Sequence, residues 1–183
     1  MTGFLRKLAI GLAAGLMAAS AMGPAAANND APRIALANIY YLDTSGEPGD
    51  RTAEHAARIA LFESKLGEGL ANRAAYQVVA LTCGQPECSV GTLSVEKAVE
   101  AAAALEVDYL LLGAVQKVST LVGMGRVDII DIEDRRDVFS RVLSFRGDTD
   151  EAFVRVADFV VTNVSQADFD DAAGPGPAGA ANR

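Results

Sequence analysis

The sequence predicts a single α/β domain, with a mixed sheet of about five strands and helices packed on it. Strand-like apolar runs and helical periodicity follow one another in the order β-α-β-α-β-β-β-α. One apolar run, over residues 108–113, is uninterrupted, as is typical of a strand covered on both faces. Removing an expected leader of 27 residues from the 183 leaves 156, which is the length of one ordinary domain.

The first 27 residues resemble an export signal. Arg6 and Lys7 provide a positively charged start, residues 8–22 form an apolar run, and residues 25–27 are the small residues that a signal peptidase recognises. A membrane anchor is the alternative, but the apolar run is shorter than the roughly 20 residues that span a bilayer. We therefore expect cleavage near Ala27 and an exported mature protein without a membrane span.

The mature chain is strongly acidic. The whole chain has a formal charge of −8, and the leader contains two of its 16 basic residues and none of its 24 acidic ones, so the mature chain carries −10. A chain of this charge repels nucleic acid and anionic membrane surfaces. We expect no nucleic-acid partner.

The first half of the mature chain is expected to form two strands and two helices. Residues 33–41 are apolar and β-prone, and a loop rich in turn formers follows at 43–50. Apolar residues at 3–4 spacing predict a helix over about 51–72. A short strand over 76–81 comes next, and then a helix capped by Ser94.

The second half is expected to form a three-stranded antiparallel meander and a last helix. The strands are predicted at 108–122, 126–132 and 138–145, with a hairpin turn at 123–125 between the first two. Asp148 and Glu151 have the spacing of a capping box that opens the last helix. The globular domain is expected to cover 28–166. Residues 167–183 are rich in Ala, Gly, Pro and Asp without periodicity, which predicts a disordered tail.

Two stretches carry a family resemblance. Residues 113–119 read GAVQKVS and residues 146–153 read RGDTDEAF. Together with the loop at 43–47, they resemble a family of small exported proteobacterial proteins classed as a domain of unknown function. The resemblance covers about residues 33–163. Ala114 and Phe153 stand where that family usually has tryptophan, and this chain has no tryptophan.

This resemblance implies a fold similar to the amino-terminal domain of TolB and to the periplasmic part of the CsgG and LpoB lipoproteins. Those proteins are interaction modules and not enzymes. Some relatives are associated with periplasmic quinoprotein alcohol dehydrogenases. The resemblance therefore implies a non-enzymatic periplasmic protein that assists a quinoprotein dehydrogenase or an envelope complex, with a protein partner and no cofactor.

The polar residues of the two stretches are the candidate partner-binding residues. Gln116, Lys117 and Ser119 fit either the polar half of an alternating strand or an exposed strand edge that recruits another chain. We favour docking, and we include Asp148 and Asp150 of the second stretch.

The two cysteines, Cys83 and Cys88, allow three interpretations. A structural zinc site needs about four ligands, and only the distant His55 adds to this pair. Thioredoxin-like chemistry prefers a Cys-x-x-Cys spacing at a helix start. A disulfide that closes a short loop fits an exported protein best. A thiol-redox protein, or one that binds a small ligand or cation, is the alternative.

His55 is the one histidine, and no catalytic motif surrounds it. A catalytic interpretation would pair it with Asp50 or Glu54 and with Ser45 or Ser64 as the nucleophile, but no nucleophile-elbow sequence is present. We interpret His55 as a histidine on the helix surface and the acidic residues as solvated. We expect neither a catalytic nor a metal site.

Overall fold

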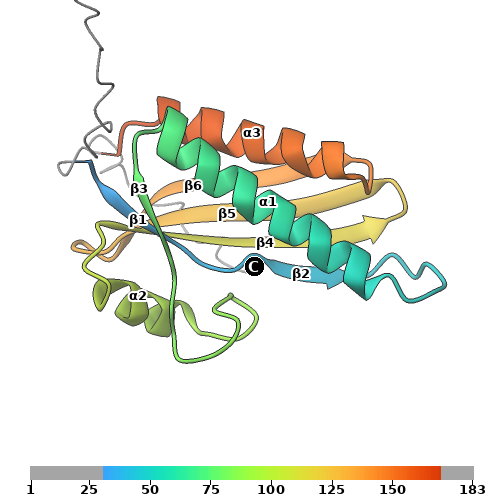
Figure 1. Cartoon of the computed structure of the whole chain (residues 1–183), viewed down its shortest axis with the longest axis horizontal. Helices are drawn as coiled ribbons and strands as arrows, with labels where there is room; N and C mark the ends of the chain where they lie inside the picture. The colour runs from blue at the N-terminus through green and yellow to red at the C-terminus, as the bar shows by residue number, and fades with distance from the viewer. Residues whose placement is uncertain (1–30, 170–183) are drawn as a thin grey trace, which may run out of the picture.

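The computed structural model describes residues 31–169, so the expected leader and most of the expected tail lie outside the described part. Two helices, α1 (Thr52–Arg73) and α3 (Asp150–Gln166), lie side by side on one face of a six-stranded sheet (Figure 1). The short helix α2 (Val95–Ala103) covers part of the other face. Among residues 31–169, no helix has the length and apolar character needed to cross a bilayer.

The sheet is mixed, as predicted. Its order is β3-β1-β4-β5-β6. Strand β2 pairs with β4 on the same side as β1, farther along β4. The parallel pairs are β1 with β3, β1 with β4 and β2 with β4, whereas β4, β5 and β6 form an antiparallel meander. The strands are β1 (Arg33–Leu36), β2 (Tyr40–Asp43), β3 (Gln77–Ala80), β4 (Tyr109–Ser119), β5 (Val122–Asp131) and β6 (Arg136–Arg146). The predicted fold class and the order of helices and strands are confirmed.

The predicted first strand is divided into β1 and β2 at residues 37–39. The backbone N–H of Asn38 donates to the carbonyl of Cys88 (3.0 Å), and the Asn38 side chain accepts from the N–H of Cys88 (3.0 Å). The N–H of Ile39 donates to the carboxylate of Glu63 on α1 (2.7 Å). The strand is interrupted because the cysteine loop and α1 provide partners for backbone groups that would otherwise pair in the sheet.

The predicted hairpin turn at 123–125 is wrong. The chain turns at residues 120–121, and both glycines lie inside β5. A Cβ on Gly123 would overlap the ring of Phe145, and a Cβ on Gly125 would lie 2.7 Å from the carbonyl oxygen of Ala114. These glycines therefore allow close cross-strand packing and do not form a turn.

The hydrophobic core has two parts, one on each face of the sheet. Leu111 of β4 belongs to the larger part beneath α1 and α3, whereas Leu110 and Leu112 belong to the smaller part beneath α2. Successive residues of a strand point to opposite faces, so the uninterrupted apolar run at 108–113 reflects a strand buried on both sides. Phe169 is also buried, against Tyr76, Tyr109 and Phe139. The packed chain therefore continues at least to residue 169, three residues beyond the expected boundary.

Helices α1 and α3 approach each other closely at Gly69. A Cβ added there would lie 2.6, 3.0 and 3.2 Å from three atoms of the Val161 side chain on α3. Rotating Val161 would not relieve all three contacts, because one of them is to its own Cβ. Gly67, two residues earlier in the same helix, has only ordinary contacts at 3.9 Å to Leu36 and Val78.

We predict opposite effects for alanine at these two glycines. Gly67→Ala should raise the free energy of unfolding by about 0.5–1 kcal/mol, because alanine restricts the unfolded chain and favours the helix. Gly69→Ala should lower it by about 1–2 kcal/mol, because the added methyl group forces α1 and α3 apart. Urea unfolding at neutral pH measures both. Equal effects of the two substitutions would contradict close packing at Gly69.

Candidate functional site

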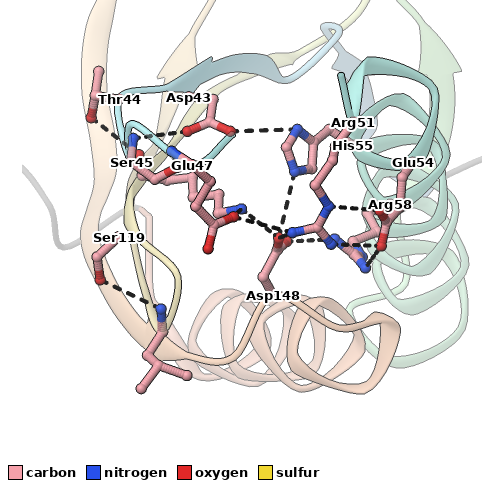
Figure 2. A network of polar contacts seen from close by, with 12 residues as sticks. Asp43, Thr44, Ser45, Glu47, Arg51, Glu54, His55, Arg58, Ser119 and Asp148 are labelled. Atoms are coloured by element: carbon pink, nitrogen blue, oxygen red, sulfur yellow. Dashed lines mark hydrogen bonds and ion pairs between the residues drawn. The ribbon is translucent and has the colours of Figure 1, made fainter. Parts of the chain in front are cut away.

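The two family-like stretches and the loop at 43–47 meet at one end of the sheet. Lys117 comes from β4, Glu47 from the loop between β2 and α1, and Asp148 from the loop between β6 and α3. Gly147 has a φ of +100°, a left-handed conformation that favours glycine, at the turn immediately before Asp148. In Figure 2, the Asp148 carboxylate lies where contacts from several elements converge.

Asp148 contacts three cations. Its Oδ2 lies 2.8 Å from Nζ of Lys117 and 3.1 Å from Nη1 of Arg51, and its Oδ1 accepts from Nη1 of Arg58 at 2.6 Å. Arg51 is the N-cap residue of α1 and Arg58 lies in the second turn of this helix, so this carboxylate joins the start of α1 to β4 and to the start of α3. Hydrogen bonds between charged groups are the strong ones.

Two further carboxylates complete the cluster. Glu47 pairs with Lys117 and with Arg51, whose Nη1 lies 3.2 Å away. Glu54 accepts two hydrogen bonds of 2.8 Å from Arg51 and also pairs with Arg58. We call these six residues the ion network: three carboxylates (Glu47, Glu54 and Asp148) and three cations (Arg51, Arg58 and Lys117). The charges within the network compensate one another.

The centre of the ion network is shielded from solvent. The side chains of Lys117, Arg58 and Asp148 are 4%, 9% and 11% exposed. Burial alone would raise the pKa of Asp148, but the hydrogen bond from Lys117 and the charges of Arg58 and Lys117 outweigh burial and lower this pKa. Burial alone would lower the pKa of Lys117, but its hydrogen bonds to Asp148 and Glu47 raise this pKa. Both groups are therefore held in their charged forms.

The interpretation of His55 as a surface histidine is wrong. Its side chain is only 8% exposed and lies between Asp148 (3.5 Å from Nε2) and Asp43 (3.7 Å from Nδ1). The ring of Tyr41 lies 5.0 Å from the imidazole ring, and burial, followed by the charges of Asp43 and Asp148, raises the pKa of Tyr41 to about 12. Residues of β2 and of the loop between β6 and α3 cover this side of α1, which helical periodicity alone does not indicate.

The idea that β4 is an exposed edge is also wrong, because β4 pairs with β1 and β2 on one side and with β5 on the other. Gln116 and Lys117 point to opposite faces of the strand. Gln116 is exposed and donates to Thr44 (2.9 Å), whereas Lys117 is buried in the ion network. Docking by these residues stays a prediction, and for Lys117 it would require opening the network.

Ser119 and Asp150 lie at the margins of this site. The Ser119 hydroxyl accepts from the N–H of Leu121 (3.4 Å) in the turn between β4 and β5. Asp150 is exposed, and its carboxylate lies 3.5 Å from Nε of Arg58. The structure thus brings Lys117, Asp148 and Asp150 together and places Gln116 and Ser119 outside their cluster.

The predicted capping box is shifted by one residue. Thr149, and not Asp148, is the N-cap of α3, and its hydroxyl accepts from the N–H of Ala152 (3.3 Å). Because Thr149 performs the capping, the carboxylate of Asp148 is free to point into the ion network.

Little space is available beside the buried charges. The cavity bordered by Tyr41, Lys117 and Asp148 has a volume of about 10 Å³, which is the space of a single water molecule. A larger groove of about 580 Å³ lies between β2 and α1, and Asp43, Glu63 and Glu87 line it without any Lys or Arg. His55 borders that groove, but its contacts to Asp43 and Asp148 hold it inside the packed cluster.

The predicted disulfide between Cys83 and Cys88 is confirmed. Cys88 is only 3% exposed and packs in the smaller core beneath α2. Over residues 31–169, no three His, Cys, Asp or Glu side chains are placed together as a metal site would require.

The family model DUF3280, described as a protein of unknown function (DUF2380), matches residues 32–164. The chain belongs to this family. The matched range contains both family-like stretches and all six residues of the ion network, so the resemblance expected from those stretches is confirmed. No curated protein matches the chain.

Several solved structures resemble this DUF3280 member in fold. PelC from Paraburkholderia phytofirmans, a dodecamer, is 18% identical with a TM-score of 0.48, covering 75% of this chain and 89% of PelC. The LpoB C-terminal domain from Salmonella enterica is 14% identical with a TM-score of 0.41, covering 62% and 82%. TolB from Acinetobacter baumannii is 11% identical with a TM-score of 0.44, covering 75% of this chain and 29% of TolB.

Sequence reasoning did not find Arg51 or Arg58 as parts of this site, and it considered Glu54 only as a partner of His55. The i,i+4 spacing of Glu54 and Arg58 is visible in the sequence, but the same spacing is common on solvated helix faces. The signal becomes specific only when Asp148, 90 residues after Arg58, is known to lie beside them.

We predict that Lys117→Met strongly destabilises the fold. The substitution leaves Asp148 and Glu47 without their shared cation, and breaking a buried ion pair from one side costs about 3 kcal/mol. Lys65→Met is the matched control, because Lys65 pairs with Glu68 on the surface of α1 and is 40% exposed. The control should change the free energy of unfolding by less than about 1 kcal/mol. Equal stability of the two variants would show that the network does not hold the fold.

We also predict that stability falls in acid because of the network. The pKa values of Asp148 and Glu47 are lowered in the fold, and hydrogen bonds from Arg51 lower the pKa of Glu54 to about 2. Such groups stabilise the fold above their ordinary pKa, near 4, and this contribution is lost as the pH falls toward their folded pKa. Urea unfolding at pH 7, 4 and 3 should therefore show a steep fall in the free energy of unfolding. The Asp148→Asn variant should have a lower free energy of unfolding at pH 7, and this free energy should fall less between pH 7 and pH 3 than that of the unmodified protein. An equal fall in both proteins would exclude a contribution from Asp148.

Proposed function

We propose that this protein is exported to the periplasm and acts there as a non-enzymatic accessory protein that binds a protein partner. The observation that supports this most directly is the closed ion network. The side chains that resemble catalytic groups contact one another around a cavity of about 10 Å³.

Catalysis needs an acid, base or nucleophile within hydrogen-bond reach of a bound substrate. Lys117 and Asp148 are buried at the centre of the ion network, where their charged groups form ion pairs with each other, with Glu47 and with the arginines. The geometry therefore favours a structural role for this cluster and leaves function to the molecular surface.

Export is supported by the leader and by the disulfide. Residues 1–27 have the charged start, apolar run and small-residue end of a cleavable signal. Disulfides persist in oxidising compartments and are rare in the cytosol. Cys88 is buried and Cys83 is partly buried against the same core, which favours a structural disulfide over a thiol-redox role, because exchange needs access to a sulfur.

The partner is proposed to be a component of a periplasmic quinoprotein dehydrogenase or of an envelope complex. The support is the resemblance of residues 113–119 and 146–153 to exported proteins with such associations. Function does not follow from fold alone, so the partner must be identified by experiment.

The proposal is tested by cross-linking in living cells of the source bacterium, with an affinity tag at the carboxyl terminus. The recovered protein is expected to begin at Asn28 and to carry one specific periplasmic protein, identified by mass spectrometry. The same tag on an unrelated exported protein controls for non-specific capture.

Two results would contradict the proposal. One is recovery of an uncleaved or cytoplasmic chain. The other is robust turnover in a screen of hydrolase and oxidoreductase substrates that Lys117→Arg or Asp148→Asn abolishes while the variants remain folded.

A further inference from the structure

The outer edge of β6 is an open strand edge. Within residues 31–169, β6 pairs only with β5, so alternate backbone N–H and C=O groups of β6 face away from the sheet. The strand has 11 residues, about twice the length of an average strand. An edge of this length offers hydrogen bonds to an added strand.

The charges along β6 leave one part of this edge unprotected. Natural proteins protect open edges with charged residues, and Arg136, Asp137, Arg141 and Arg146 are the charged residues of β6. The four residues between Arg141 and Arg146, at 142–145, carry no charge. A short extended segment can therefore pair with the edge there.

This part of the edge borders a groove between β6 and α3. The groove has a volume of about 510 Å³, and its apolar lining includes Val142, Phe145, Val156 and Phe159. Val142 is 67% exposed and Phe159 is 51% exposed, so two large apolar side chains of the groove face solvent. The groove therefore offers an apolar surface next to unpaired backbone groups, the combination that binds a peptide by strand addition.

The charge of the groove differs from that of the rest of the molecule. Its charged lining residues are Arg146 and Arg155, and no Asp or Glu lines it. Within residues 31–169 Arg146 forms no ion pair, and Arg155 has Glu151 one helical turn before it. In a chain of net charge −8, two arginines beside an apolar groove point to an acidic occupant.

We propose that the groove between β6 and α3 binds an extended, acidic peptide segment of a protein partner. The segment adds as a strand beside residues 142–145, places apolar side chains against Phe145, Val156 and Phe159, and pairs a carboxylate with Arg146 and Arg155. This inference rests on the proposed interaction function and identifies the surface that performs it.

The test is selection from a library of random octapeptides displayed on phage, with the exported protein as the target. Enriched peptides should alternate apolar residues with Asp or Glu. Added as synthetic peptides, they should shift the amide resonances of residues 142–146 and slow hydrogen exchange of alternate β6 amides. Residues that line the acidic groove between β2 and α1 should be unaffected.

Charge-reversal variants make the test specific. Arg155→Glu and Arg146→Glu should each weaken peptide binding at least about tenfold, which corresponds to about 1.4 kcal/mol. Lys97→Glu is the matched control, because it makes the same change in net charge on exposed α2 and should bind like the unmodified protein. Phe159→Lys should also weaken binding, and urea unfolding confirms that all variants fold.

Several outcomes would overturn the inference. These are a library without binders, enrichment of basic peptides, or unchanged binding by both arginine variants. Self-association that Arg155→Glu abolishes would assign the groove to a second copy of this chain. Binding that appears only after removal of residues 170–183 would assign it to the chain's own carboxyl-terminal segment.

The same variants separate this inference from the proposed function. If the Arg155→Glu variant is cross-linked to the partner in cells as well as the unmodified protein is, the role proposed for the groove is overturned and the interaction function is left intact. The absence of any specific partner, with peptides still bound in the groove, would overturn the accessory role instead.

Discussion

The charge of Asp148 constrains three separate parts of the chain. A carboxylate removed from water is costly unless cations and hydrogen bonds compensate it. Asp148 obtains this compensation from Arg51 and Arg58 at the start of α1 and from Lys117 on β4. The start of α1, the end of β4 and the entry to α3 must therefore come together for the carboxylate to be buried, and the loop carrying Glu47 follows because it completes the charge balance.

Local patterns predicted most of the fold, whereas contacts between distant residues decided the features that were missed. Helices α1 and α2 were placed within a residue or two, because helical periodicity and a Ser94 cap are local signals. The break between β1 and β2 depends on Asn38 and Cys88, which are 50 residues apart. Likewise, strand alternation cannot distinguish a polar side chain in solvent from Lys117, whose partner Asp148 enters 31 residues later. The motifs therefore indicated residues that do cluster, whereas the burial of Lys117 was misjudged.

The molecule has a closed, ion-paired end and an open side. At the end where β2, β4 and α1 meet, charges are paired with each other and little space remains. Along β6, backbone groups, apolar side chains and arginines face outward together. The first arrangement stabilises a conformation, and the second is suited to recognition. Both are built on the same antiparallel meander, so the rigid end orients the strand that carries the open edge.

The docking of the disulfide loop beside the sheet depends on whether Cys83 and Cys88 are oxidised or reduced. The backbone of Cys88 exchanges two hydrogen bonds with Asn38 at the break between β1 and β2. In a reducing compartment Cys83 and Cys88 would be free thiols, and the loop would lose more conformational entropy on reaching this position. Oxidation removes part of that cost. Closing the disulfide therefore favours the final docking of the loop at the break between β1 and β2.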